Sequence, residues 1–211
     1  MCSSDLGVEV QLTVHNRGTI VRLLAENEID LAIMGTPPGE FETVAREFAD
    51  HPLVFIASPD HRLAQKRRID PRLLAEETLL IREPGSGTRS ALERFLVEHG
   101  VAAGSLMELG SNETIKQAVM AGLGISFISE HTIGLERSVG RLVCLNVNGT
   151  PLNRQWRLVH RTDKRLMPAA TAFVEFMNAE GSRLIEEQIG RHDAPRAKAV
   201  GPSGKPTPGK R

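Results

Sequence analysis

The sequence predicts an α/β fold with two lobes, and two observations lead to that prediction. Apolar residues recur alternately at helical and at strand spacing along most of the chain, as they do in α/β proteins. This alternation occurs in two series, before about residue 42 and after about residue 78, and extended segments lie between and after them. The extended segments are interpreted as two crossings between separate lobes. In such an arrangement ligands usually bind in the cleft between the lobes.

The composition is typical of a globular protein. The chain has 211 residues, of which 40% are hydrophobic and 25% are charged, and both Lys+Arg and Asp+Glu number 26. This balance argues against a nucleic-acid surface over the chain as a whole. The only cysteines, Cys2 and Cys144, are too few for a disulfide framework and predict a reducing cytoplasm. The absence of a long apolar run and of a signal-peptide pattern predicts neither membrane insertion nor secretion.

The first series begins after residues 1–6, which we interpret as a foreign or poorly ordered leader. Alternating apolar residues predict a strand over 8–14, a loop at 15–18, a helix from about residue 20 to Asn27, and an apolar strand over 30–34. The two strands are expected to pair in parallel in a βαβ unit. The loops HNRG and GTPP then follow their carboxyl ends and face a ligand.

Extended segments at 42–48 and 52–59 lead into the second series. A short helix is predicted over 70–77 with Pro71 at its first position, and the second series follows it as strand 78–81, helix 88–99, strand 105–109, helix 112–121 and strand 125–128. A strand over 155–160 and an amphipathic helix over 169–178, with Phe173, Val174 and Phe176, follow. The Pro- and Gly-rich basic segment 191–211 is predicted to be disordered, and a solvated end is favoured over a nucleic-acid contact.

The segment 108–130 organises the second series. Ser111 or Asn112 is a good N-cap, Glu113 suits the first turn, and Gly122 supplies the left-handed residue that ends a helix. The free N–H groups at that helix start suit an anionic or strongly polar ligand. Plain α/β scaffolding is nevertheless the favoured reading of the pattern alone.

The segment REPGSGTRS offers a second helix start. Gly85, Gly87 and Ser90 occupy the positions of a dinucleotide fingerprint whose third glycine is missing, which is weak evidence for a dinucleotide. The N–H groups of residues 86–89, with Arg82 and Arg89, could instead hold a phosphate or carboxylate. A tight glycine turn with solvated arginines is an equally favoured interpretation.

Motifs for catalysis are absent from the sequence. It contains neither a G-x-S-x-G nucleophile elbow nor an H-E-x-x-H metal motif, and its histidines are scattered singly. His61 and His160 are interpreted as structural residues. We therefore expect no catalytic residue, no metal and no cofactor.

Several long runs resemble one known family. The run VEVQLTVHNRGTIVRLLAENEIDLAIMG resembles the effector-binding domain of LysR-type transcriptional regulators. The later runs GTPP, HPLVFIASPDHRLA, REPGSGTR, ELGSNETIKQAVMAGLGISFIS and RLVCLNVNGTPLNRQWRLVHR resemble the branch that controls carbon-fixation (Calvin-cycle, Rubisco) operons. The resemblance extends from Gly7 to about Gly181.

The resemblance implies a type 2 periplasmic-binding-protein-like fold, with two Rossmann-like subdomains joined by two crossover strands. Residues 7–190 would form the domain, with lobe I at about 7–54 plus 157–190 and lobe II at about 58–154. The implied function is to sense a small anionic effector, such as a sugar bisphosphate, phosphoenolpyruvate or NADPH, in the cleft. By position in the family, the effector contacts would be Asn16, Arg17, Thr36, Pro37, Glu83, Ser86, Thr88, Arg89, Asn112 and Glu113.

The family's DNA-binding domain, first strand and first effector-domain helix would precede Gly7, so the chain is expected to be a fragment. One wall of the effector site would then be missing, and the chain alone is expected to bind effector weakly and not to bind operator DNA. Promoter DNA through the absent domain, a homodimer or homotetramer and RNA polymerase are the implied partners.

Two other classes of function stay open at this point. A solute-binding protein of a transporter would share the fold. A prephenate-dehydratase-like lyase would need an acid or nucleophile, for which Glu83 and Glu113 are the main candidates.

Overall fold

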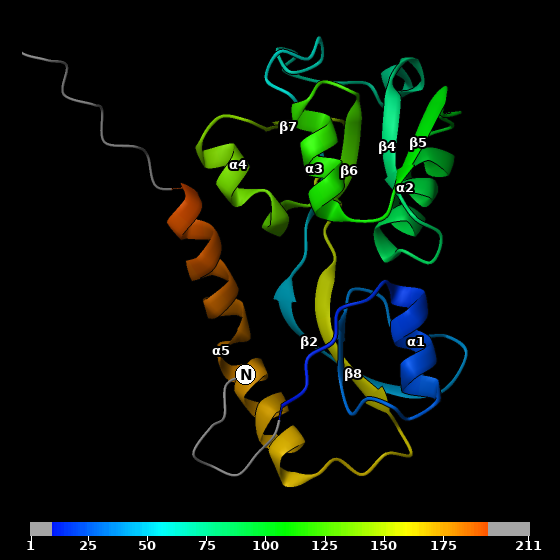
Figure 1. Cartoon of the computed structure of the whole chain (residues 1–211), viewed down its shortest axis with the longest axis vertical. Coiled ribbons are helices and arrows are strands. Elements are labelled where there is room, and N and C mark those ends of the chain that lie inside the picture. Colours follow the sequence, from blue (N-terminus) through cyan, green and yellow to red (C-terminus); the bar gives the residue numbers. More distant parts are fainter. Residues whose placement is uncertain (1–9, 194–211) are drawn as a thin grey trace, which may run out of the picture.

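The chain folds into two lobes, each built on its own sheet, in a computed structural model that describes residues 10–193 (Figure 1). We call the part with the three-stranded sheet lobe I and the part with the five-stranded sheet lobe II. The strands of lobe I are β1 (Ala32–Met34), β8 (Gln155–Arg161) and β2 (Thr43–Asp50), in that order. Those of lobe II are β5 (Ser105–Leu109), β4 (Thr78–Arg82), β6 (Ile125–Ser129), β3 (Leu53–Ala57) and β7 (Val143–Leu145), in that order. The predicted two-lobed α/β fold is confirmed.

Lobe I is centred on β8, which pairs antiparallel with β1 on one side and β2 on the other. Helix α1 (Arg17–Ala25) packs on this sheet through Leu24, which is buried with Met34 and Val159. The helix begins earlier than predicted because Asn16 caps it, and Asn27 follows its end with a left-handed φ of 58°. A sheet of three strands can bury only a small core, so lobe I has the smaller of the two cores.

The predicted strand over 8–14 is wrong in its described part. Residues 10–14 have no regular structure, and Val10, Leu12 and Val14 are 79%, 85% and 84% exposed. The free edge of β1 has no partner among residues 10–193, so the predicted parallel βαβ unit does not form. Alternation makes a segment compatible with a strand, but its backbone groups still need a neighbouring strand to pair with.

Lobe II is a three-layer α/β unit. Strand β4 is parallel to β5 and β6, and β3 is antiparallel to β6 and β7. Helix α2 (Gly87–Glu98) packs with Leu79 and Ile81 on one face of β4. Helix α3 (Asn112–Met120) packs with Leu80, the residue between them, on the other face. Strands covered on both faces read as continuous apolar runs, which is why the sequence pattern located them.

Local signals in lobe II agree closely with the structure. Ser111 is the N-cap of α3, its hydroxyl accepting from the Thr114 N–H at 3.1 Å, and Gly122 has a φ of 78°. The predicted helix after Asp70 is the 3-10 helix η1 (Pro71–Glu76). Three short elements were not predicted, because they are too short to show a period: η2 (Glu130–Thr132), α4 (Gly134–Ser138) and β7.

Helix α5 (Pro168–Asp193) is much longer than the predicted helix over 169–178. It packs along β2 and reaches α4 of lobe II, so it spans both lobes (Figure 1). Val174 is buried as expected, whereas Phe173 and Phe176 remain 42% and 50% exposed. The helix passes Arg191, where the tail was predicted to begin; the rest of that tail and the predicted leader lie outside the described residues.

Two short crossings connect the lobes. The chain passes from β2 to β3 through His51 and Pro52, and it returns to β8 through residues 152–154. The crossings are hydrogen-bonded to each other, from the His51 N–H to the Arg154 carbonyl at 2.7 Å and from the Leu53 N–H to the Leu152 carbonyl at 3.0 Å. We call these paired crossings the hinge.

Candidate functional site

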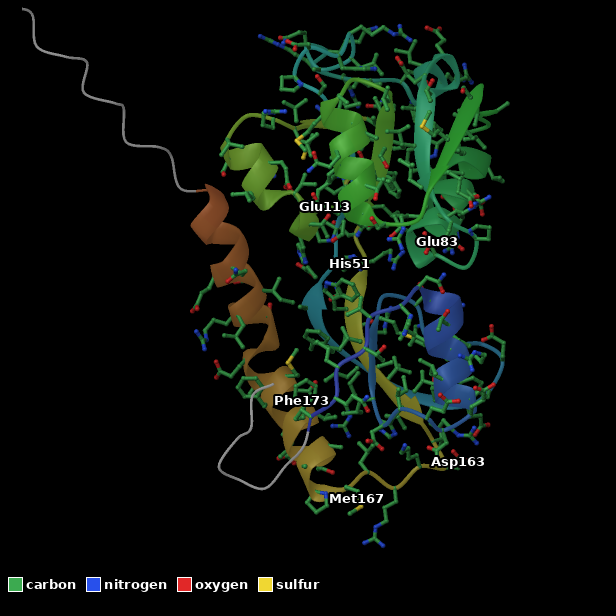
Figure 2. The ribbon with its side chains drawn as sticks, viewed as in Figure 1. His51, Glu83, Glu113, Asp163, Met167 and Phe173 are labelled. Atoms are coloured by element: carbon green, nitrogen blue, oxygen red, sulfur yellow. The ribbon has the colours of Figure 1, made fainter. Side chains whose placement is uncertain are left out.

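The lobes touch where the start of α1 meets the loop between β4 and α2. The Gly18 N–H donates to the Gly85 carbonyl at 3.0 Å. A Cβ on Gly18 would lie 3.6 Å from the Gly85 Cα, and Gly85 itself has a φ of 85°. The glycines of HNRG and REPGSGTR therefore allow two helix N-termini to approach each other. Figure 2 shows Glu83 and His51 at this level between the lobes.

Asn16 connects the two lobes at this contact. Its side-chain oxygen caps α1 by accepting from the Thr19 N–H at 3.0 Å. Its side chain also hydrogen-bonds to the carboxylate of Glu83 in lobe II. Asn16, which was predicted to contact the effector, therefore also has a structural role.

Arg17 holds the neighbouring loop of lobe I in place. Its guanidinium donates to the carbonyls of Thr36 at 3.1 Å and Pro37 at 3.0 Å. These three predicted residues are therefore brought together. Their contact uses backbone carbonyls, so two of the donors of Arg17 are already engaged.

Arg82 holds two side chains of lobe II in place at the contact between the lobes. It donates two hydrogen bonds to the Glu83 carboxylate, from Nε at 2.8 Å and from Nη2 at 2.9 Å, and its Nη1 donates to Asn112 at 2.6 Å. Burial raises the pKa of Glu83, but the bonds and charge of Arg82, a backbone N–H and Asn16 together hold it below its ordinary value. Glu83 is therefore ionised at neutral pH. An anionic ligand that binds Arg82 must compete with this carboxylate.

The remaining predicted residues divide into two sets. Ser86 is 3% exposed and caps α2 by accepting from the Thr88 N–H at 3.3 Å, so both belong to the meeting helix starts. Arg89 instead bonds to Glu93, Glu108 and the Arg82 carbonyl. Glu113, with a side chain 64% exposed, bonds to Lys116 and Gln117. The ion pairs of Arg89 and Glu113 hold both side chains within lobe II.

An aromatic cluster at the hinge was missed by sequence reasoning. His51 stacks on Trp156 with ring centroids 3.7 Å apart, and the Trp156 indole N–H donates to His131 at 3.4 Å. Burial, with the nearby charges of Arg154 and His131, lowers the pKa of His51 to about 3. Burial also lowers the pKa of His131. His51, His131 and Trp156 are far apart in the sequence, so no short motif predicted that they would form a cluster.

Residues 10–193 contain no group of three or more His, Cys, Asp or Glu side chains that could hold a metal ion. Among the helices of this described part, none is long and apolar enough to cross a bilayer. What the contact region offers is hydrogen-bond donors and charges from both lobes, suited to recognising a small polar molecule.

Residues 3–182 match the model of the LysR substrate binding domain. The chain belongs to this LysR family. It is 51% identical over 178 residues to a RuBisCO operon transcriptional regulator of Allochromatium vinosum, covering 84% of this chain and 59% of that protein. It is 46% identical over 185 residues to the HTH-type transcriptional regulator CbbR of Xanthobacter flavus, covering 87% of this chain and 56% of the relative. These relatives are transcriptional regulators, which agrees with the expectation that the chain has no catalytic residue.

Solved LysR domains show the same fold. The regulatory domain of CcmR from Synechocystis PCC6803, in complex with 2-PG, has a TM-score of 0.79 and 38% identity, covering 82% of this chain and 83% of that one. The effector-binding domain of QuiR in complex with shikimate, with a TM-score of 0.70 and 20% identity, is similar in fold. The periplasmic-binding-protein-like architecture expected from the resemblance is thus confirmed for this LysR domain. The transporter and lyase alternatives gain no support from these relatives.

Proposed function

We propose that the chain is the metabolite-sensing, effector-binding domain of a cytoplasmic LysR-type regulator of carbon-fixation genes. The observation that carries the proposal is the 51% identity to a RuBisCO operon regulator across 84% of this chain. The chain covers about three fifths of that relative's length (59%), so DNA binding, a homodimer or homotetramer and contact with RNA polymerase are proposed for the whole protein.

The proposed effector is a small phosphorylated acid, bound between the lobes. The support is the complex of CcmR with 2-PG, in a domain 38% identical to this chain. We place the ligand among Asn16, Arg17, Thr36 and Pro37 of lobe I and Glu83, Ser86, Thr88 and Asn112 of lobe II, with Arg89 and Glu113 at its margin. Its phosphate is proposed to face the N–H groups at the start of α2 and to compete with Glu83 for Arg82.

Binding between the lobes would signal the presence of the metabolite by changing how the two lobes are arranged relative to each other. Asn16 and the Gly18–Gly85 hydrogen bond join the lobes at this level. A ligand held by both sides favours one inter-lobe arrangement only by the difference in its affinity for the two arrangements. The proposed mechanism is therefore a shift in inter-lobe geometry that is passed to a DNA-binding domain.

The test is a thermal-unfolding screen of the 211-residue chain against 2-phosphoglycolate, phosphoenolpyruvate, a sugar bisphosphate and NADPH, with inorganic phosphate and sulfate as controls. A ligand that binds only the folded state at a hundredfold excess over its Kd adds about 2.7 kcal/mol of stability. We expect a rise in the unfolding midpoint beyond that caused by phosphate or sulfate, which is lost in Asn112→Ala and kept in Arg72→Gln, a substitution outside the proposed site. Equal shifts in both variants would reject the placement, and no selective shift in the folded wild type would reject the sensor proposal for this chain.

A further inference from the structure

A cavity between the lobes lies beside the hinge and has a volume of about 330 Å³. Its walls come from three parts of the molecule: the loop after β1 at Gly35, helix α2 at Arg94 and Glu98, and the returning chain at Arg154, Gln155 and Arg157. Among the residues proposed to contact the effector, only Thr36 also lines this cavity. The volume is in the range of small-molecule sites.

Strand β8 contributes residues both to this cavity and to the aromatic cluster. Gln155 and Arg157 line the cavity, whereas Trp156, between them, stacks on His51. Successive side chains of a strand point to opposite faces. Gln155 and Arg157 therefore lie on the face of β8 opposite Trp156.

Arg154 lies in the wall of the cavity with its charge uncompensated. Its Nη1 donates to the Gly87 carbonyl at 3.2 Å, but its Nε is buried without a hydrogen-bond partner. No carboxylate pairs with it among residues 10–193. Burial, followed by the charges of Arg94 and Arg157, lowers the pKa of Arg154. A half-buried cation without a counter-charge is costly, so this arrangement favours binding of an anion.

The other two arginines leave the cavity with an excess of positive charge. Arg94 makes no ion pair with any described residue. Arg157 pairs with Glu47 and donates to the Gly35 carbonyl at 2.7 Å. Glu98 is the one carboxylate in the wall, against three guanidinium groups. Guanidinium groups bind phosphate and carboxylate oxygens through paired N–H donors, which makes the cluster suitable for an oxyanion.

We propose that this cavity is a second anion site, which binds a small dianionic metabolite carrying phosphate or carboxylate groups. Arg94 contributes from lobe II, Arg157 from lobe I and Arg154 from the hinge. A ligand held by all three fixes the distance between the lobes beside the hinge. It therefore changes affinity at the other inter-lobe site, and by linkage the effect is reciprocal. The inference stands on the cavity itself and does not depend on the identity of the effector.

Equilibrium dialysis of the 211-residue chain with radiolabelled sulfate, at constant ionic strength set with chloride, tests the proposal. We expect Arg94→Gln to weaken sulfate binding by about tenfold or more, since hydrogen bonds to charged groups contribute strongly. Arg94→Lys, which keeps the charge but not the forked donors, is expected to lose less. The matched control Arg72→Gln removes an arginine of lobe II outside the cavity and should bind sulfate as the wild type does.

The outcomes separate this site from the effector site. Sulfate binding that is equal in Arg94→Gln and Arg72→Gln overturns the proposal, as does no binding to the wild type. A loss that follows Arg82→Gln and spares Arg94→Gln also overturns it, by assigning sulfate to the effector site. Without sulfate, Arg94→Gln should unfold at a temperature no lower than the wild type, because it relieves repulsion on Arg154; a lower midpoint would count against the repulsion. Failure of 2-phosphoglycolate to bind would reject the effector proposal, whereas sulfate binding would still test the arginine-lined cavity.

Discussion

His51 lies almost parallel to Trp156, with 3.7 Å between the ring centroids and 13° between the ring planes. His51 belongs to the outgoing crossing, and Trp156 follows the returning one. The stack therefore joins the two crossings, and Figure 2 shows His51 at the level where the lobes meet. Because the pKa of His51 is near 3, the imidazole in this stack is neutral at pH 7.

Acidification should destabilise the fold through His51. Its folded-state pKa of about 3 lies below the ordinary value of 6.5, so between those pH values the unfolded chain binds a proton that the folded chain does not. Stability therefore rises with pH in this window, and the loss from pH 6.5 to pH 5 should be about 2 kcal/mol. Urea unfolding at several pH values should show a flatter dependence for His51→Asn. The exposed control His15→Asn should keep the wild-type slope; an equal slope in all three proteins would contradict the prediction.

Asn16 can be separated into its two roles by substitution. Asn16→Ala should lower the free energy of unfolding by about 1 kcal/mol, because α1 loses its cap. Asn16→Ser keeps a capping oxygen but is too short to reach Glu83, so it should recover most of that stability. In both variants the pKa of Glu83 should rise, which titration followed by NMR can measure. Equal destabilisation by Ala and Ser would argue that the bond to Glu83, rather than the cap, stabilises this contact.

Gly124→Ala should be among the most destabilising glycine substitutions in lobe II. A Cβ at this position would lie 2.3 Å from the Thr78 carbonyl oxygen, and the φ of 157° disfavours a side chain. The free energy of unfolding should fall by about 2 kcal/mol or more. Gly110→Ala, where a Cβ would meet no heavy atom within 4 Å, is the matched control. Similar denaturation midpoints for the two variants would show that the β4–β6 contact can relax.

Lys116 and Glu136 should show strong coupling. Their side chains are each 12% exposed and form an ion pair of 2.6 Å between α3 and α4. Lys116→Met should cost about 3 kcal/mol, because it leaves Glu136 largely buried without its cation. Adding Glu136→Leu should recover much of this loss, and chemical denaturation of the double-mutant cycle measures the coupling. Additive effects of the two substitutions would mean that solvent already screens the pair.

Local structure in lobe II was readable from residues close in the chain. Ser111 caps α3 and Gly122 follows its end, because both act on backbone groups within a few residues. The resemblance likewise led to the LysR family through long matching runs. The loops HNRG and REPGSGTR were correctly expected to lead into helices.

The roles of charged residues could not be read in the same way. Arg89 was predicted to contact the effector, and the sequence did not indicate that its position on α2 also pairs it with Glu93 on the next turn and with Glu108 on β5. Arg82 was recognised as a possible anion ligand, yet its two bonds to Glu83 depend on side-chain orientation at the end of β4. Ion pairing is set by which side chains meet in space, and sequence spacing specifies only the local part of that.

The strand that was wrongly predicted at 8–14 shows the limit of what the sequence alone decides. Helix caps, glycine turns and doubly buried strands follow from local sterics, backbone hydrogen bonding and the period of apolar residues, so the sequence alone decided them. Pairing of an edge strand, the His51–Trp156 stack and the arginine-lined cavity join residues that are far apart in the chain. Tertiary structure alone decided these. A strand needs a neighbouring strand to pair with its N–H and C=O groups, and the pKa of a titratable group depends on the burial, charges and hydrogen bonds around it.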